Sequence, residues 1–229
     1  MKKFVLALMC FISTISISAN VKAQPLVTAT PEKPCVISAI GDSITYSTTY
    51  AAVLDMRPEI TVKNYGLCAS QIAGIDETSF VNRTKKEKFK SDIILIFGGT
   101  NGYLGNMAMC NPMGAPDDED ISTFFGAYNT MVKNIKKNNP KSKIVLITPI
   151  KRKGMDAKND YGLTLSHYVL ATQMVADRNG VACIDLFNNE RCDLTTFGSD
   201  HLIDGLHPTL EGHTILAETI FQALLDLGY

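Results

Sequence analysis

The chain has 229 residues, 45% of them hydrophobic, and it carries 22 basic and 23 acidic side chains. This length and apolar content are sufficient for one domain with a substantial hydrophobic core. The slightly acidic balance argues against a nucleic-acid-binding protein and against binding to anionic membrane surfaces, because both partners attract basic proteins.

The first residues predict a secretory signal peptide. Two lysines at positions 2 and 3 precede an apolar run over residues 4–12, and Val21-Lys22-Ala23 has the small-x-small pattern of a signal peptidase site. We therefore expect a signal peptide over residues 1–23, an extension over 24–34, one domain over 35–229, and a periplasmic or secreted protein. The apolar run is too short to span a bilayer as a mature helix, so we expect no stable membrane insertion after cleavage.

From residue 35 onward, predicted strands alternate with predicted helices. The pattern predicts strands at Val36–Ile40, Ile60–Asn64, Asp92–Phe97, Lys143–Thr148 and Val181–Leu186, and the third of them is the continuous apolar run expected of a central parallel strand. Apolar residues at helical spacing predict helices at Thr48–Met56, Ile121–Ile135, Leu165–Ala176 and Leu216–Leu227, and a polar helix is expected at Glu77–Lys90. This alternation predicts an α/β protein with a flavodoxin-like, five-stranded parallel sheet, which binds ligands beyond the carboxyl ends of its strands.

Four polar stretches follow the predicted strands. They read GDSIT at 41–45, NYG at 64–66, GGTN at 98–101 and DGLHP at 204–208. Acyl transfer needs a hydroxyl nucleophile, a base, an acid that orients the base, and donors that face the oxyanion. Ser43 offers the hydroxyl and His207 the base, and Asp204 lies three residues before that base, within reach of it on one turn. Gly66 can expose a backbone N–H, and the Asn101 amide can donate a second hydrogen bond.

Each stretch also has a simpler interpretation. Gly, Asp and Ser are common in turns, GGTN fits a plain loop, and His207-Pro208 can begin a helix. The hydroxyl-rich segment from Ser43 to Thr49 could also bind a phosphate, as the corresponding loop does in flavin-mononucleotide proteins of this topology. The phosphate interpretation leaves GGTN and DGLHP unexplained, whereas acyl transfer uses all four stretches in order.

The ordered set resembles the four sequence blocks of the SGNH hydrolases, also called the GDSL esterase/lipase family, over roughly residues 36–226. The resemblance implies a three-layer α/β/α sandwich. It also implies a triad of Ser43, Asp204 and His207, with an oxyanion hole formed by the Ser43 and Gly66 N–H groups and the Asn101 amide. The chain departs from the family pattern at three positions, with Gly102 in place of an aspartate, Ala69 in place of a glycine and Ser47 in place of another glycine.

We therefore expect an exported serine esterase that needs no cofactor or metal. The expected substrates are small-molecule or carbohydrate esters with short acyl groups, acetyl above all. A lysophospholipase or thioesterase of the same family is the enzymatic alternative. A non-catalytic carbohydrate-binding protein on a hydrolase fold is the alternative from another class.

Other polar groups fit structural roles. Export permits disulfides, but the five cysteines that remain after signal cleavage are an odd number, and their pairing stays open. Cys35 and Cys183 lie in strand-like runs and are expected to be buried. DDED at 117–120, the lysine-rich stretch 85–90 and KRK at 151–153 are expected to be solvated. His167 and His213 are expected to be structural, whereas the roles of His201 and of the long loop 102–120 stay open.

Overall fold

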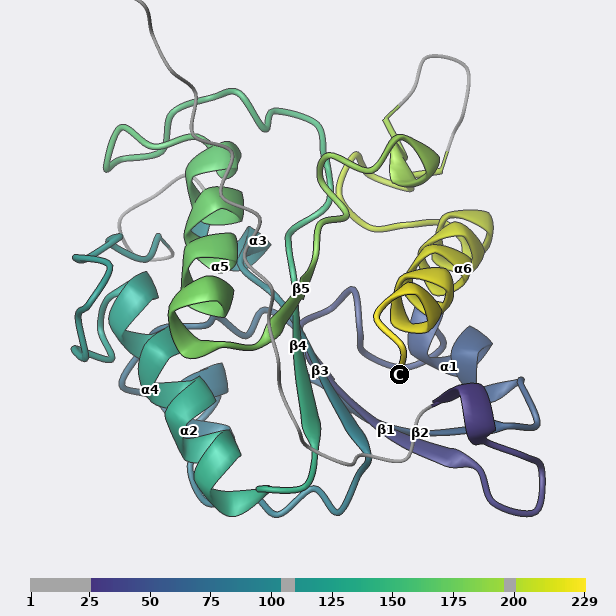
Figure 1. Ribbon diagram of the computed structural model, residues 1–229. Coiled ribbons are helices and arrows are strands. Elements are labelled where there is room, and N and C mark those ends of the chain that lie inside the picture. The colour runs from purple at the N-terminus through teal and green to yellow at the C-terminus, as the bar shows by residue number, and fades with distance from the viewer. Residues whose placement is uncertain (1–25, 104–109, 196–200) are drawn as a thin grey trace, which may run out of the picture.

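A five-stranded parallel sheet forms the centre of the computed structural model, which describes residues 26–103, 110–195 and 201–229 (Figure 1). The predicted signal peptide and part of the loop 102–120 lie outside the described residues. The strand order is β2-β1-β3-β4-β5, the predicted flavodoxin-like order, and every neighbouring pair is parallel. The strands are β1 (Cys35–Gly41), β2 (Ile60–Gly66), β3 (Ile93–Phe97), β4 (Lys143–Ile147) and β5 (Ala182–Ile184). The predicted strands are therefore confirmed, although β5 is shorter than expected.

Helices cover both faces of the sheet and complete the predicted three-layer sandwich (Figure 1). One face packs against α1 (Tyr50–Asp55) and α6 (Leu210–Asp226). The other packs against α2 (Phe80–Arg83), α4 (Phe124–Asn138) and α5 (Leu165–Asn179), and α3 (Thr100–Tyr103) follows β3. Short 3-10 turns occupy Leu26–Thr28 and Glu190–Cys192. None of the helices in the described residues is long and apolar enough to cross a membrane.

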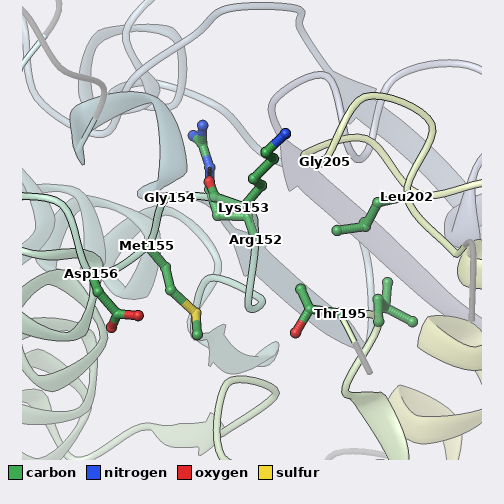
Figure 2. A pocket seen from close by; sticks show the side chains of 9 residues that line it. Arg152, Lys153, Gly154, Met155, Asp156, Thr195, Leu202 and Gly205 are labelled. Atoms are coloured by element: carbon green, nitrogen blue, oxygen red, sulfur yellow. Dashed lines mark hydrogen bonds between the residues drawn. The ribbon is translucent and has the colours of Figure 1, made fainter. Parts of the chain in front are cut away.

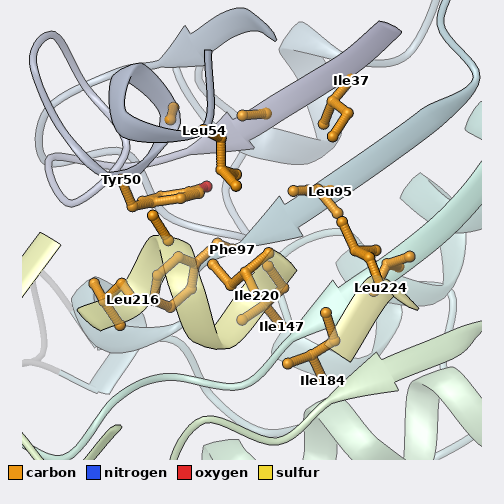
Figure 3. Close-up of a cluster of buried hydrophobic side chains, with 14 of the residues drawn as sticks. Ile37, Tyr50, Leu54, Leu95, Phe97, Ile147, Ile184, Leu216, Ile220 and Leu224 are labelled. Carbon is orange, nitrogen blue, oxygen red and sulfur yellow. The ribbon is translucent and has the colours of Figure 1, made fainter. Parts of the chain in front are cut away.

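The central strands β1, β3 and β4 are apolar and buried on both faces, whereas β2 at the edge of the sheet is mostly half-buried or exposed. Figure 3 shows Ile37 and Leu95 of the sheet meeting Leu54 of α1 and Ile220 of α6. All four side chains are fully excluded from solvent. Each buried side chain of this size stabilises the fold by about 1.5–3 kcal/mol relative to an exposed one.

The expected helix over Glu77–Lys90 is wrong, because only one turn of helix forms there, at Phe80–Arg83. The four lysines between residues 84 and 90 are all exposed and form no apolar stripe for the sheet, so tertiary packing cannot hold a longer helix. Lys90 adopts a positive φ of 50°, and the Phe89 N–H donates to the Asn139 side chain at 2.8 Å instead of to a helical carbonyl.

The sheet brings the candidate blocks to one edge. In the register of the central strands, Gly41 of β1 lies opposite Gly66 of β2 and Phe97 of β3. The segments that follow these three strands therefore emerge side by side. The loop before α6 reaches the same edge, because the Lys153 N–H, just past β4, donates to the Gly205 carbonyl at 2.8 Å.

Candidate active site

Ser43 is presented by a tight turn at the carboxyl end of β1. The Asp42 side chain accepts a hydrogen bond from the Ile44 N–H at 2.9 Å, and the Asp42 carbonyl accepts from the N–H groups of Thr45 and Tyr46. A Cβ on Gly41 would lie 1.8 Å from the Thr45 hydroxyl, so only glycine fits before the turn. Ser43 itself is half-buried, which leaves its hydroxyl accessible from the carboxyl edge.

The three predicted triad residues form one hydrogen-bonded chain. Ser43 Oγ lies 2.9 Å from His207 Nε2, and His207 Nδ1 lies 2.7 Å from Asp204 Oδ2. With Nδ1 donating to the carboxylate, Nε2 is left as an acceptor for the serine proton. Ser43 and His207 are 164 positions apart in the chain, so the fold alone brings them together.

The three-residue spacing between Asp204 and His207 works because the carboxylate holds the turn as well as the imidazole. Its Oδ1 accepts from the His207 N–H at 2.8 Å and from the Leu206 N–H at 2.9 Å. Gly205 has a φ of 81°, a left-handed conformation that glycine adopts without strain. The hydrogen bonds from the His207 backbone and ring hold the pKa of Asp204 well below its usual range, so the carboxylate stays ionised.

Asn101 is positioned for the predicted oxyanion role. It sits in α3 at the end of β3 and is 5% exposed, and its Nδ2 donates to the Ser70 carbonyl at 3.0 Å. A side-chain amide carries two N–H groups, so one remains for a ligand. The departure at Gly102 also has a physical reason. A Cβ there would lie 2.5 Å from the Asn111 side-chain oxygen, so Asn111 occupies the space that a larger residue at 102 would need.

Gly66 is placed next to the nucleophile turn, but its N–H already has a partner. It donates to the Asn64 side-chain oxygen at 2.8 Å, while the Asn64 amide donates to the Thr45 carbonyl at 2.7 Å. A Cβ on Gly66 would lie 2.4 Å from the Tyr46 backbone nitrogen. The glycine therefore allows β2 to pack closely against the turn, and its predicted role as an oxyanion donor stays a prediction.

Ala69 departs from the family pattern, and its sequence position alone indicated no role in the site. Its φ is 59°, a conformation that glycine adopts most easily, which explains why the resembling family has glycine three residues after Gly66. The Ala69 N–H donates no hydrogen bond to another described residue. The carbonyl of the next residue, Ser70, accepts a hydrogen bond from the Asn101 amide. The Ala69 N–H therefore lies one residue along the chain from the contact that holds Asn101.

Two buried charges lie behind the nucleophile. Asp42 is 2% exposed, and burial raises its pKa to about 6, against the opposing effects of its hydrogen bond and of the nearby positive charges. The Arg83 guanidinium donates to the Gly41 carbonyl at 2.7 Å and to the Tyr65 carbonyl at 2.6 Å, and burial lowers its pKa to about 10. Arg83 therefore ties the ends of β1 and β2 together.

The remaining sequence predictions have mixed outcomes. His167 caps α5 together with Thr164, and His213 lies buried in α6, where desolvation lowers its pKa to about 4. The loop 204–208, which carries Asp204 and His207, is here called the triad loop. His201 lies beside this loop, and its carbonyl accepts a hydrogen bond from the Thr209 N–H at 2.8 Å. These contacts support the structural interpretation of His167 and His213 and place His201 at the margin of the site.

Acidic and sulfur-containing groups behave mainly as expected. Within DDED, the Asp120 side chain accepts from the Ser122 N–H at 2.9 Å just before α4 begins, and Glu119 pairs with Lys133. Cys35 is buried and carries a free thiol, as do the partly buried Cys183 and the exposed Cys68.

A pocket of about 450 Å³ opens beside the triad loop (Figure 2). Its charged lining residues are Arg152, Lys153 and Asp156, its apolar ones are Met155, Leu194 and Leu202, and Gly205 of the triad loop also lines it. This corrects the expectation that KRK at 151–153 is a solvated surface. Lys151 pairs with Asp193 at 2.7 Å and Arg152 is half-buried, so only Lys153 is fully exposed.

A second pocket, about 640 Å³, is separate from these residues. It is lined by Lys143 and Ile144 at the start of β4 and by Ala182 at the start of β5. It therefore lies at the amino ends of the strands, whereas the triad lies beyond their carboxyl ends.

Comparisons with known proteins give one family and a set of related folds. The model of the GDSL-like lipase/acylhydrolase family matches residues 39–215. No curated protein matches the chain by sequence. One solved structure is 27% identical with a TM-score of 0.78, covering 86% of this chain and 98% of its own.

Two further structures are more distant and bear on the fold alone. A possible lipase from Chitinophaga pinensis is 23% identical, with a TM-score of 0.69 and coverage of 84% of this chain and 98% of its own. A catalytic mutant of an acetylxylan esterase from Geobacillus stearothermophilus is 18% identical, with a TM-score of 0.60 and coverage of 82% of this chain and 93% of its own.

Proposed function

The chain belongs to the GDSL-like lipase/acylhydrolase family and hydrolyses ester bonds, and we propose that it removes short acyl groups, acetyl above all, from carbohydrate esters. The observation that carries the proposed mechanism is the chain from Ser43 Oγ through His207 to Asp204, with distances of 2.9 and 2.7 Å. This is the arrangement in which a base can take a serine proton while a carboxylate holds its second nitrogen.

In the proposed mechanism, Ser43 attacks the ester carbonyl as His207 accepts its proton. The resulting imidazolium is stabilised by Asp204, which stays ionised, and it then protonates the leaving alcohol. Water, deprotonated by the same imidazole, attacks the acyl-enzyme and releases the acid. No step requires a cofactor.

For the oxyanion we propose three donors: the Ser43 N–H, the Asn101 amide and the Ala69 N–H. The Gly66 N–H would first have to give up its hydrogen bond to Asn64, whereas the Ala69 N–H has no such bond to break. Donors that are fixed before the reaction stabilise developing charge without having to reorganise.

Three observations favour a short acyl group on a sugar over a long fatty chain. The pocket beside the triad has three charged lining residues, which suit a polar substrate better than an alkyl chain. A structure that shares the fold is described as an acetylxylan esterase, and this supports the sugar ester as substrate class. Export, which rests on the signal-like residues 1–23, would place the enzyme where such polymers occur.

The test is a panel of p-nitrophenyl esters from C2 to C16 together with acetylated xylo-oligosaccharides, with kcat/KM measured for the mature protein. We expect the highest value at C2 and a steep fall by C8, with acetate released from the oligosaccharides. A maximum at C12 to C16 would instead favour a lysophospholipase. Binding of oligosaccharides by a folded protein that hydrolyses none of these esters would favour the non-catalytic alternative.

A further inference from the structure

The pocket beside the triad loop, here called the basic pocket, carries more positive than negative charge. Its lining has two cationic side chains, Arg152 and Lys153, and one acidic side chain, Asp156. Figure 2 shows the charged ends of Arg152 and Lys153 pointing to the same side, with the Asp156 carboxylate well apart from them. Across residues 26–103, 110–195 and 201–229, no acidic side chain forms an ion pair with either cation, although Asp204 lies near enough to Arg152 to attract its charge.

Arg152 lacks a partner for part of its guanidinium. Its Nε donates to the Lys153 carbonyl at 3.3 Å, and the group lies 5.8 Å from the centre of the Tyr103 ring. Its Nη1 is buried and has no hydrogen-bond partner among the described residues. A buried donor without a partner is costly, and the planar guanidinium fork fits the two oxygens of a carboxylate or phosphate.

The neighbouring Lys151 shows the contrast. Its ammonium is neutralised by Asp193 at 2.7 Å, with both side chains about a quarter exposed. Of three consecutive basic residues, one is therefore paired within the protein, whereas the other two line the pocket and form no ion pair with a described residue.

The location of the basic pocket indicates which part of the substrate would enter it. Gly205 lines the pocket and lies between Asp204 and His207. The leaving alcohol must lie next to His207, because that imidazole has to protonate it. In the proposed site the acyl oxygen faces the oxyanion donors, Asn101 among them, and not His207. The alcohol moiety is therefore the part of the ester nearest to the basic pocket.

We propose that the basic pocket binds an anionic group, a carboxylate or a phosphate, on the alcohol moiety of the ester. This inference rests on the proposed function, and it narrows the substrate class to esters of acidic alcohols such as uronic acid residues or phosphorylated polyols. Arg152 makes the main contact, and Lys153, which is exposed, adds attraction that salt would screen.

The test compares matched acetyl esters that differ in one anionic group. Methyl glucoside and methyl glucuronide, acetylated at the same hydroxyl, form the carboxylate arm. Acetylglycerol and acetylglycerol phosphate form the phosphate arm, and acetate release gives kcat/KM. We expect at least one anionic ester to be preferred over its neutral partner by roughly tenfold, the lower end for a charged hydrogen bond at a half-exposed group. We also expect the preference to shrink with added salt.

Variants then assign the preference to the basic pocket. Arg152→Met should remove most of the preference for the anionic ester and leave hydrolysis of the neutral ester unaffected. Lys153→Met should reduce the preference by roughly threefold. Lys158→Met is the matched control. Lys158 is exposed on the same segment but does not line the pocket. Equal values for neutral and anionic esters in both arms would overturn the inference and leave the esterase proposal standing. So would an Arg152→Met defect that is the same for every ester, because that would show Arg152 acting through Asp204.

A binding measurement covers the case in which none of these esters is hydrolysed. Calorimetry with the Ser43→Ala variant is run on both pairs, the methyl glycoside acetates and the acetylglycerols. It should show tighter binding of at least one anionic ester than of its neutral partner, and this difference should be lost in Ser43→Ala/Arg152→Met. Failure of the proposed function then appears as missing turnover, whereas failure of this inference appears as equal affinity within both pairs.

Discussion

Replacing Asp42 by asparagine should stabilise the folded protein at neutral pH and leave it nearly unchanged at pH 4. The Asp42 carboxyl is 2% exposed, and its Oδ1 accepts from the Ile44 N–H at 2.9 Å. An asparagine oxygen can accept the same bond, so the substitution removes the charge but keeps the turn. The change therefore isolates the cost of holding a carboxylate in this buried position.

The magnitude follows from the pKa of Asp42, which burial raises to about 6, whereas an aspartate in the unfolded chain has a pKa of about 3.9. Below pH 3.9 both states are protonated, and the group makes no difference to stability. Between pH 3.9 and 6 the unfolded state loses its proton while the folded state keeps it, so stability falls as pH rises. At about 1.36 kcal/mol per pKa unit, the total loss by pH 7 is about 3 kcal/mol.

Thermal unfolding at pH 4, 5, 6, 7 and 8 measures this effect. For a domain of this size, 1 kcal/mol corresponds to about 2–4 °C in Tm. The Tm of Asp42→Asn should therefore exceed that of wild type by about 6–12 °C at pH 7, whereas the two Tm values should nearly coincide at pH 4. Asp117→Asn is the control, because Asp117 is exposed in a loop. A Tm difference between Asp42→Asn and wild type that stays constant from pH 4 to pH 8 would refute the reasoning.

Three further predictions concern the reacting groups. Ser43→Ala should lower kcat by about 10⁴ or more without changing the circular dichroism spectrum, and a folded variant with most of its activity would exclude Ser43 as the nucleophile. Asn101→Ala should lower kcat by roughly 10²–10³ with little effect on KM, because the amide acts mainly in the transition state; a defect confined to KM would make Asn101 a substrate-binding residue. The lowered pKa of Asp204 keeps its carboxylate ionised as pH falls, so the acidic limb of a kcat/KM profile belongs to another group. Asp204→Asn should therefore lower the rate by about 10⁴ across that profile, and a normal rate at high pH would show that the carboxylate is not needed.

The sheet could be predicted from sequence because its central strands β1, β3 and β4 are apolar runs that are buried on both faces. Ile94 and Leu95, for example, are fully buried on opposite sides of β3. A strand with one face in water would expose one of these two apolar side chains, so the pair predicts a strand covered on both faces. The grouping of Ser43, Asp204 and His207 could be predicted as well, because these residues sit in short motifs with fixed spacing. What joins them is the strand order, and the alternation of strands and helices already favours that order.

Features that depend on tertiary contacts were not predictable in the same way. Arg83 lies in a polar stretch that predicted a surface helix, yet its guanidinium binds the carbonyls at the ends of β1 and β2. Arg152 belongs to a basic run that predicted a solvated surface, yet it is half-buried beside the triad loop. Charge and polarity in a sequence predict solvent exposure on average. They do not identify the few charged side chains that tertiary contacts partly bury.

The second backbone donor of the oxyanion hole offers the sharpest distinction between sequence motif and structure. The motif favours the Gly66 N–H, but in the structure that N–H donates to Asn64. The Ala69 N–H donates to no described residue, and Ala69 has a φ of 59°. Replacing one residue by the α-hydroxy acid with the same side chain exchanges its N–H for an ester oxygen, so lactic acid at 69 and glycolic acid at 66 test the two donors separately. We expect the change at 69 to lower kcat by roughly 10²–10³. The change at 66 should cost only about 1 kcal/mol in stability, from the lost bond to Asn64. Stopped-flow measurement of acylation and a thermal scan give both quantities, and a kcat loss at 66 with none at 69 would return the role to Gly66.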